Sequence, residues 1–282
     1  MTSALKLKQG RFGRVALLDS DQDLVPHTHP QCHVLIKAHG ADTEFEVRGE
    51  RHALTRESMV LVNAWEPHAK VHRPESGTST VLALYIEPDW LAGHDRGLGV
   101  AGLHGFFPRS CVAMPAHIRM HADRLIACMF EPAQGEAEQA RWEAALSELM
   151  MAVIHGCSAW RERAALTRTS LRRLSDPRIN QAIRYMREHL DTRLSFDALA
   201  RECHLSRPHF FHLFKTCTAV SPAMYVNTLR MESAFGKLPG GATINDLAGL
   251  LGFSEPQHFT RFFRNNLGIP PSEYRRRVEL LR

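Results

Sequence analysis

The sequence predicts an α+β chain in which an N-terminal β-barrel with flanking helices precedes a C-terminal all-α domain. Three observations predict it: short β-rich runs up to about residue 87, apolar residues at helical spacing from residue 117 onward, and two helix-turn-helix patterns in tandem near the end of the chain. We expect a barrel over residues 1–116, a helical region over 117–166, a linker over 167–176, and the two helix-turn-helix units over 177–282.

The first part of the chain consists of short runs rich in β-branched and aliphatic residues, and glycines and prolines separate them. Regular short strands of this kind are typical of a sandwich or barrel. The expected strands are Arg14–Leu18, His33–Lys37, Glu44–Arg48, Ser58–Val62, Ala69–His72 and Thr80–Ile86.

Four histidines in this part could hold a transition metal. His27, His29 and His33, followed by Gly40, have the spacing of the first cupin motif, with His33 at the position of the usual glutamate, and His68 matches the second motif. This part of the chain therefore resembles a cupin, whose fold would bring the four positions together. Neutral imidazoles suit Zn, Ni, Fe or Cu.

The other interpretation of these histidines is that they line a polar ligand pocket or only cap the barrel rim. Lys37, Glu46 and Trp65 are further pocket candidates, but the favoured interpretation of each is an ordinary barrel residue. Cys32 is not a candidate ligand, because it should point to the opposite face of the strand from His33.

Two helices are expected between the barrel and the C-terminal domain, His117–Phe130 and Glu136 to about Ala165. The apolar seam of the second helix could pair two subunits into a homodimer, or it could pack against the chain's own barrel. The candidate dimerisation residues are Trp142, Leu146, Leu149, Met150 and Val153.

Each helix-turn-helix pattern places a serine, Ser206 or Ser254, where the second helix begins, and Pro208 or Pro256 falls in the first turn. The copies are offset by 48 residues up to the serines and by 49 after them, so the second has one extra residue at its turn. Residues facing outward from such a helix reach DNA base edges. The candidate DNA contacts are Arg207, Pro208, Phe211, His212 and Lys215 in the first copy and Glu255, Gln257, Thr260, Arg261 and Arg264 in the second.

The C-terminal part resembles the DNA-binding domain of the AraC/XylS family of bacterial transcription regulators. The matching residues are Gly252-Phe-Ser254, then His258-Phe-x-Arg261-x-Phe263-Arg264, then Gly268-Ile-x-Pro271-Ser272-x-Tyr274-Arg275. The resemblance implies a long connecting helix over residues 221–238 and a cupin as sensing domain. It also implies double-stranded promoter DNA as partner, and RNA polymerase as a second partner because the family leans towards activators.

The first recognition helix departs from the family pattern, which commonly has arginine at the position of His212 and often a polar residue at Phe211. Gln257 and Arg261 are therefore the stronger candidates for base contacts, whereas Phe211 could contact a thymine methyl group and His212 a phosphate.

Charge follows the same division. Residues 1–166 carry 17 Lys+Arg against 20 Asp+Glu, a net of −3, and residues 167–282 carry 18 against 10, a net of +8, which together give the +5 of the whole chain. An acidic front and a basic back are typical of a sensing domain followed by a phosphate-binding domain. No apolar run approaches 18 residues and the six cysteines form no CxxC pair, so we expect a cytoplasmic protein with reduced cysteines and no membrane contact.

Three functions fit these observations. The favoured one is a sequence-specific DNA-binding regulator whose barrel senses a small molecule or metal. The second is a cupin metalloenzyme fused to a helical domain; the lack of a clear acid/base partner for the histidines counts against it. The third is an effector-independent DNA-binding protein with a vestigial barrel.

Overall fold

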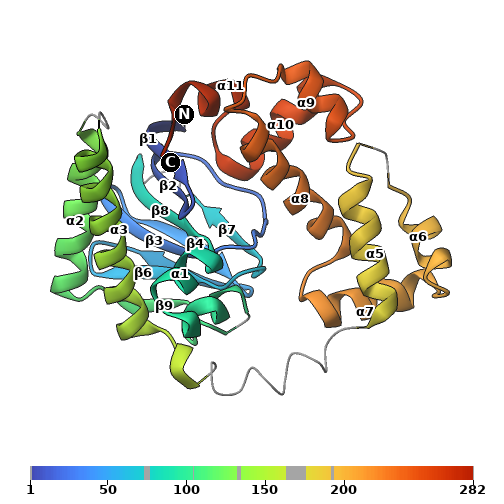
Figure 1. The fold of residues 1–282 in the computed structure, drawn as a ribbon, viewed down its shortest axis with the longest axis horizontal. Coiled ribbons are helices and arrows are strands. Elements are labelled where there is room, and N and C mark those ends of the chain that lie inside the picture. The colour runs from blue at the N-terminus through green and yellow to red at the C-terminus, as the bar shows by residue number, and fades with distance from the viewer. Residues whose placement is uncertain are drawn as a thin grey trace.

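The computed structural model describes residues 2–72, 77–103, 105–131, 135–162, 176–191 and 194–281. A β-rich N-terminal domain flanked by two long helices faces an arc of helices from the C-terminal half (Figure 1). The predicted fold class is therefore confirmed. Apart from Asp176, the linker expected over 167–176 lies outside the described residues.

The N-terminal domain is built from two sheets. The larger runs in the order β10-β1-β2-β8-β3-β6-β9 and the smaller in the order β5-β4-β7. The strands are β1 (Ser3–Gly10), β2 (Gly13–Ser20), β3 (Cys32–Gly40), β4 (Thr43–Val47), β5 (Glu50–Leu54), β6 (Ser58–Val62), β7 (His68–Val71), β8 (Ser79–Ile86), β9 (Cys111–Ala113) and β10 (Val278–Leu280). All six expected strands are present, with ends that differ by up to three residues.

The central strands are apolar along their whole length because both of their faces are covered. Every residue of β8 is buried, and so are the first five of β3. One face packs on the helices and includes Cys32, which is fully buried there as expected. The other face encloses Leu35, Val60 and Ala83 between the two sheets.

Two antiparallel helices, α2 (Ala116–Phe130) and α3 (Glu136–Cys157), cover the large sheet, beside the short helices α1 (Pro88–His94) and η1 (Arg96–Gly102). The second expected helix thus ends at Cys157, well before Ala165. The five candidate dimerisation residues, Trp142, Leu146, Leu149, Met150 and Val153, are at most 3% exposed and lie in the core that α3 shares with the barrel. The apolar seam therefore packs on the chain's own barrel, and these side chains are not available to a second subunit.

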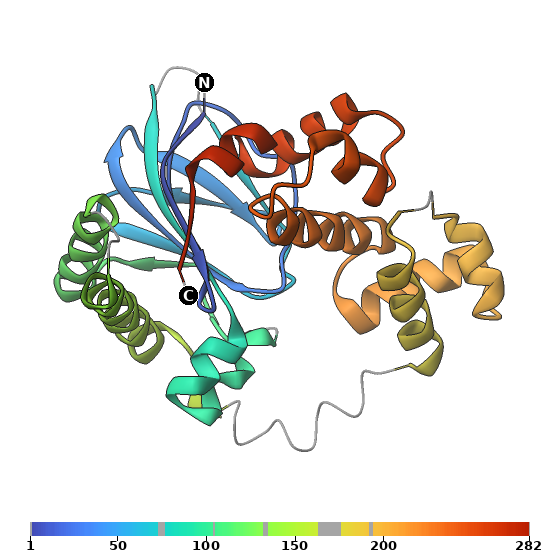
Figure 2. The same cartoon turned by 45° about the horizontal axis from the view of Figure 1, so that its top comes forward.

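The C-terminal half holds two helix-turn-helix units joined by one helix (Figure 2). The first unit is α5 (Pro177–Glu188), α6 (Phe196–Glu202) and α7 (Arg207–Thr218), and the second is α9 (Ile244–Leu250), α10 (Pro256–Leu267) and α11 (Pro271–Arg277). The connecting helix α8 (Pro222–Lys237) is capped by Ser221, whose hydroxyl accepts from the Met224 N–H. At about 1.5 Å per residue it is roughly 24 Å long.

The extra residue of the second unit changes which residue caps its recognition helix. Ser206 is the N-cap of α7, but the N-cap of α10 is Glu255, so Ser254 lies one position too early to cap. The Ser254 hydroxyl oxygen instead lies 3.3 Å from His258 Nδ1. The N-cap expected at Ser254 is therefore wrong by one residue.

The end of the chain returns to the barrel. β10 pairs in parallel with β1, with Leu7 opposite Val278, and Lys8 forms a 2.7 Å ion pair with Glu279. Strands β1, β5, β9 and β10 are not among those expected from the sequence. The described part of the chain has no helix that is both long and apolar enough to cross a membrane.

A histidine cluster and two recognition helices as candidate sites

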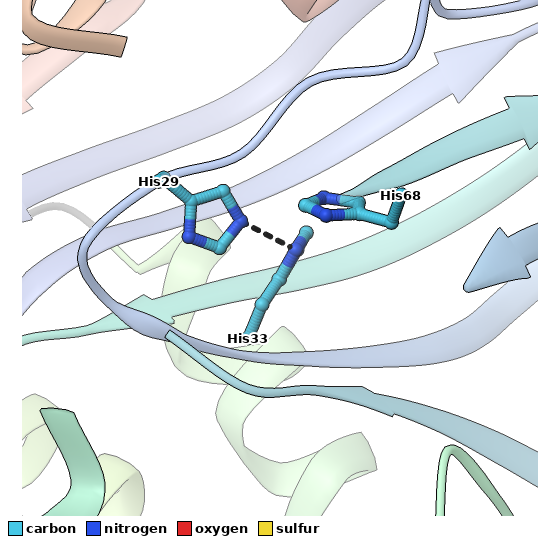
Figure 3. Close-up of side chains that lie close together, drawn as sticks. All are labelled: His29, His33 and His68. Atoms are coloured by element: carbon cyan, nitrogen blue, oxygen red, sulfur yellow. Dashed lines mark hydrogen bonds between the residues drawn. The ribbon is translucent and has the colours of Figure 1, made fainter. Parts of the chain in front are cut away.

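Three of the four predicted histidines converge inside the barrel mouth (Figure 3). His29 comes from the loop between β2 and β3, His33 from β3, and His68 from the start of β7. Their ligand nitrogens all lie within 4.8 Å of one another, and the three residues are 4%, 2% and 2% exposed. The barrel thus brings together residues that are up to 39 positions apart.

Backbone carbonyls fix which nitrogen of each ring carries a proton. His29 Nδ1 lies 2.9 Å from the Gln31 carbonyl, and His68 Nδ1 lies 2.9 Å from the Glu66 carbonyl. A carbonyl oxygen only accepts, so both Nδ1 atoms must donate, and in the neutral ring the Nε2 atom carries no proton and has a lone pair that can accept a hydrogen bond or bind a metal. This second bond from ring nitrogen to carbonyl is the usual support of a metal-binding histidine.

His33 completes the arrangement. Its Nδ1 lies 3.0 Å from His29 Nε2, and since that atom has only a lone pair to offer, His33 Nδ1 donates. His33 Nε2 then also has a free lone pair. The Nε2 atoms of His33 and His68 are buried without any hydrogen-bond partner, which is an unusual and unfavourable state for a polar atom unless a ligand fills it.

The protonation state suits metal binding as well. Burial lowers the pKa of His29, His33 and His68 well below the ordinary histidine value, and the neighbouring imidazoles lower it further. The three rings are therefore neutral at neutral pH, which is the form that coordinates a metal. Three buried imidazole nitrogens fit Zn, Ni, Fe or Cu and leave room for further ligands, and His29 Nε2 would exchange its hydrogen bond from His33 for the metal.

The fourth predicted ligand, His27, is half-buried and lies outside the group of three. Its ring centroid is 4.3 Å from that of His68, and its backbone pairs with His68 in an isolated β-bridge. Its Nδ1 also meets a carbonyl, that of Val25, at 2.8 Å, so its Nε2 is likewise free of a proton in the neutral ring. His27 is thus adjacent to the cluster without completing it.

The other pocket candidates lie elsewhere. Lys37 forms an ion pair with Asp42, and neither Lys37 nor Glu46 lines a cavity beside the histidines. Trp65 stacks face to face on Tyr225 of α8, with ring centroids 4.7 Å apart, and it adopts a left-handed backbone conformation with φ of 60°. Trp65 therefore contacts the C-terminal domain and not a ligand pocket.

Two cavities adjoin the histidines. The inner one, between the sheets, is lined by His33, His68 and mostly apolar side chains such as Leu35 and Phe45, and it has room for about 30 Å³. The outer one is a cleft of about 360 Å³ between the histidine loop and the helices α8 and α10, and His27, His29 and Arg14 are among its lining residues. The space beside the cluster thus lies mainly between the two domains.

The recognition helices present most of their predicted contacts to solvent. Arg207, Pro208, His212 and Lys215 are exposed on α7, and Glu255, Gln257, Arg261 and Arg264 are exposed at or along α10. Thr260 is half-buried, and so is Phe211, which packs on Phe196 and Phe210. The faces that would meet DNA are therefore open in both units.

Sequence reasoning missed three residues beside the cluster. Tyr85 stacks on His33 with centroids 4.0 Å apart, Arg14 lies over Tyr85, and Glu232 of α8 accepts two hydrogen bonds from Arg14. A charged residue at the head of the apolar run Arg14–Leu18 was a signal for Arg14. The partner Glu232 lies 218 positions away, and nothing local in the sequence connects them.

Comparison with known proteins agrees with both halves of this description. Residues 17–154 match the AraC-like ligand binding domain, and residues 199–277 match a helix-turn-helix domain. The HTH-type transcriptional activator RhaS of Shigella sonnei is 24% identical over 263 residues, which cover 90% of this chain and 88% of RhaS.

Two further likenesses cover different shares of the molecule. The MmsAB operon regulatory protein of Pseudomonas aeruginosa is 35% identical over 95 residues, which are 33% of this chain and 31% of that relative. The structure of a variant of ToxT from Vibrio cholerae, in its apo form, aligns over 99% of this chain and 97% of its own, with a TM-score of 0.55 at 12% identity. That structure supports the two-domain fold.

Proposed function

The chain belongs to the AraC family of DNA-binding transcription regulators, and from that premise we propose that it is a metal-dependent activator. It binds promoter DNA through α7 and α10, and a divalent transition metal in the histidine cluster is the signal or part of the signal. The observation that supports this most is the buried group of His29, His33 and His68, two of whose Nε2 atoms have no partner.

The DNA contacts we propose are the exposed residues of the recognition helices. Arg261 and Gln257 project from the early turns of α10, where they could meet base edges, and Arg207 and Lys215 would bind phosphates from α7. Activation implies RNA polymerase as a second partner, and the relative RhaS is a transcriptional activator.

The metal would be held by imidazole nitrogens alone, because the described cluster contains no carboxylate or thiolate. The Gln31 and Glu66 carbonyls keep the rings of His29 and His68 oriented with Nε2 toward the centre. When bound, the metal would supply a positive charge and open coordination positions. The chain's contribution is to keep three neutral imidazoles dry and close together.

A small organic effector is the second candidate, and the volume of the outer cleft favours it. The inner cavity has room for about 30 Å³, which suits a water molecule, whereas the cleft of about 360 Å³ could hold a small metabolite. Such an effector would therefore bind between the domains and not between the sheets.

Elemental analysis of untagged protein tests the metal. We expect about one transition metal per chain in the wild type and a loss of at least tenfold in His68→Gln, since glutamine retains much of the volume but is a poor ligand. His39→Ala is the matched control, because His39 is an exposed barrel histidine outside the cluster. Its metal content should equal that of the wild type.

Equal metal loss in both variants, or no metal in a folded wild type, would refute the metal. In the second case DNA binding should be measured against small organic ligands instead. Turnover of a substrate by the metal-loaded protein would support the metalloenzyme alternative. DNA binding that never responds to metal or ligand would support the vestigial barrel.

We keep the homodimer as part of the proposal, although the α3 seam is used within the chain. Sedimentation with and without DNA measures the oligomeric state directly.

A further inference from the structure

One face of the connecting helix α8 docks on the rim of the histidine cluster. Four of the residues that make its contacts are Tyr225, Thr228, Glu232 and Phe235. Their spacing of three, four and three residues places them in a single stripe along the helix. We call these four residues the docking stripe. Tyr225, Thr228 and Phe235 are at most 5% exposed.

Two residues of the docking stripe, Thr228 and Tyr225, contact the chain segments that carry the candidate histidine ligands. The Thr228 hydroxyl lies 3.0 Å from the Thr28 carbonyl and also 3.0 Å from the Met224 carbonyl of its own helix, so its one proton is shared between the two. Thr28 lies between His27 and His29 in the chain. Tyr225 stacks on Trp65, which lies three residues before His68 in the chain. The Trp65 backbone N–H donates to the His29 carbonyl at 2.8 Å. The loop is also tied to the second recognition helix, because the Val25 N–H donates to the Asn265 carbonyl at 3.1 Å.

The other two residues of the docking stripe, Glu232 and Phe235, contact Arg14, which connects them to His33 through Tyr85. Both carboxylate oxygens of Glu232 accept from Arg14, at 3.0 and 2.9 Å, and the guanidinium lies 3.9 Å from the Phe235 ring centroid. The same guanidinium lies over Tyr85, which stacks on His33. Burial opposes the charge of Arg14, but Glu232 more than offsets it and the pKa is raised above its usual value, so the pair stays ionised.

We propose that the docking stripe couples the histidine cluster to DNA binding: a metal bound by His29, His33 and His68 orders the segments that hold α8 and thereby fixes the two recognition helices for DNA. The inference rests on the proposed metal site and adds its mode of regulation.

The direction of the effect follows from exposure. In the docked arrangement Arg207 of α7 and Gln257 and Arg261 of α10 are all exposed, so docking does not cover the DNA-binding faces. Holding α8 in one position reduces the freedom that the two units would lose on binding DNA. Metal should therefore raise DNA affinity by preorganisation.

The test measures the DNA Kd of the full chain with and without zinc ions, on a sequence that the chain itself selects from a random pool. The variants are Thr228→Val, which keeps the side-chain shape and removes the donor, and Glu232→Gln, which removes the charge. Glu188→Gln is the control, because it makes the same charge change at an exposed site on the same domain. Zinc content of each protein is measured in parallel.

We expect zinc to tighten DNA binding of the wild type and of Glu188→Gln at least threefold. Thr228→Val and Glu232→Gln should bind the same amount of zinc while their Kd values with and without zinc coincide. A zinc response that survives in both variants would overturn the coupling, and so would a wild type that binds zinc without any change in Kd. In either case the metal site itself would stand.

A wild type that takes up no zinc would refute the proposed metal site, and the coupling is then decided by a metal-free measurement. Arg14→Gln, Glu232→Gln and the double variant should weaken DNA binding by similar factors, because each breaks the same contact. Affinities that equal the wild-type value in all three would overturn the docking stripe as a determinant of DNA binding.

Discussion

The two helix-turn-helix units have similar sequences but different attachments to the barrel. The core of the second unit is continuous with the barrel, because Phe259, Phe263 and Tyr274 pack in one cluster with Leu7 and Leu18 of strands β1 and β2. The first unit has a core of its own, to which the barrel contributes the half-buried Trp65. One recognition helix is thus built into the sensing domain, and the other is reached through α8.

Sequence similarity between repeats therefore does not imply equal mechanical roles. A change in the barrel structure should therefore act directly on the second unit, whereas it should act on the first unit only through the position of α8. The four experiments below test the comparison in order of decreasing expected effect.

The largest effect should come from emptying each core in turn. Phe263→Ala and Phe214→Ala each remove a fully buried ring, and each should cost about 3–5 kcal/mol of unfolding free energy. Hydrogen exchange should differ between them: Phe263→Ala should lower protection in β1 and β2 as well, whereas Phe214→Ala should lower it in residues 176–191 and 194–220 alone. Loss of barrel protection in both variants would contradict the comparison.

The ion pair that ties the chain end to the barrel should rank next. Lys8 has a side chain only 2% exposed, and Glu279→Ala would leave its ammonium without the carboxylate, at a cost of about 1–3 kcal/mol in chemical denaturation. Asp42→Ala is the control, since it breaks an ion pair whose acid is 60% exposed and should cost about 1 kcal/mol or less. Equal losses would mean that the closing strand adds nothing to the attachment of the second unit.

The two units should also contribute differently to DNA binding. Arg261→Ala should weaken the selected site by about 1–3 kcal/mol and bulk DNA much less. His212→Ala should lower both affinities by a similar, smaller factor, because we assign that side chain to phosphate. Competition binding at fixed salt measures both, and an equal loss on the two DNAs for Arg261→Ala would reassign that arginine to phosphate.

The smallest effect concerns Trp65, the ring contact of the barrel with the first unit. Because its φ is 60°, glycine should be favoured over alanine here by about 1 kcal/mol, the reverse of the usual order. The urea midpoints of Trp65→Gly and Trp65→Ala give the comparison. A more stable alanine variant would show that the turn relaxes once the stack on Tyr225 is gone.

Much of the fold was predictable because its signals are local. Short β-rich runs between glycines and prolines located the six expected strands, and the family resemblance implied α8. Ser221 and Thr243, which cap α8 and α9, are residue types preferred at that position. The missed strands β1 and β10 carry lysine or glutamate at positions that become buried or paired only when residues 271 positions apart meet. A charged residue in a strand is therefore expected at the surface when its partner is so distant in the sequence.

The position of the histidine cluster was predictable in part. Histidine spacing located the cluster, but it did not separate His27 from the other three, and it did not show that Trp65 faces α8. The partner of the α3 seam stayed open between a second subunit and the chain's own sheet, because an apolar seam has the same spacing in both cases; in the structure it packs on the sheet. Partner identity is a tertiary property that periodicity does not encode.

The parallel pairing of β1 with β10 has a consequence for synthesis. Leu7 and Lys8 leave the ribosome early, but their partners Val278 and Glu279 follow about 270 residues later. At typical elongation rates of about 5–20 residues per second this delay is roughly 15–50 s. During that time one edge of the barrel remains without its neighbour, so the nascent chain carries an open strand edge that chaperones could bind.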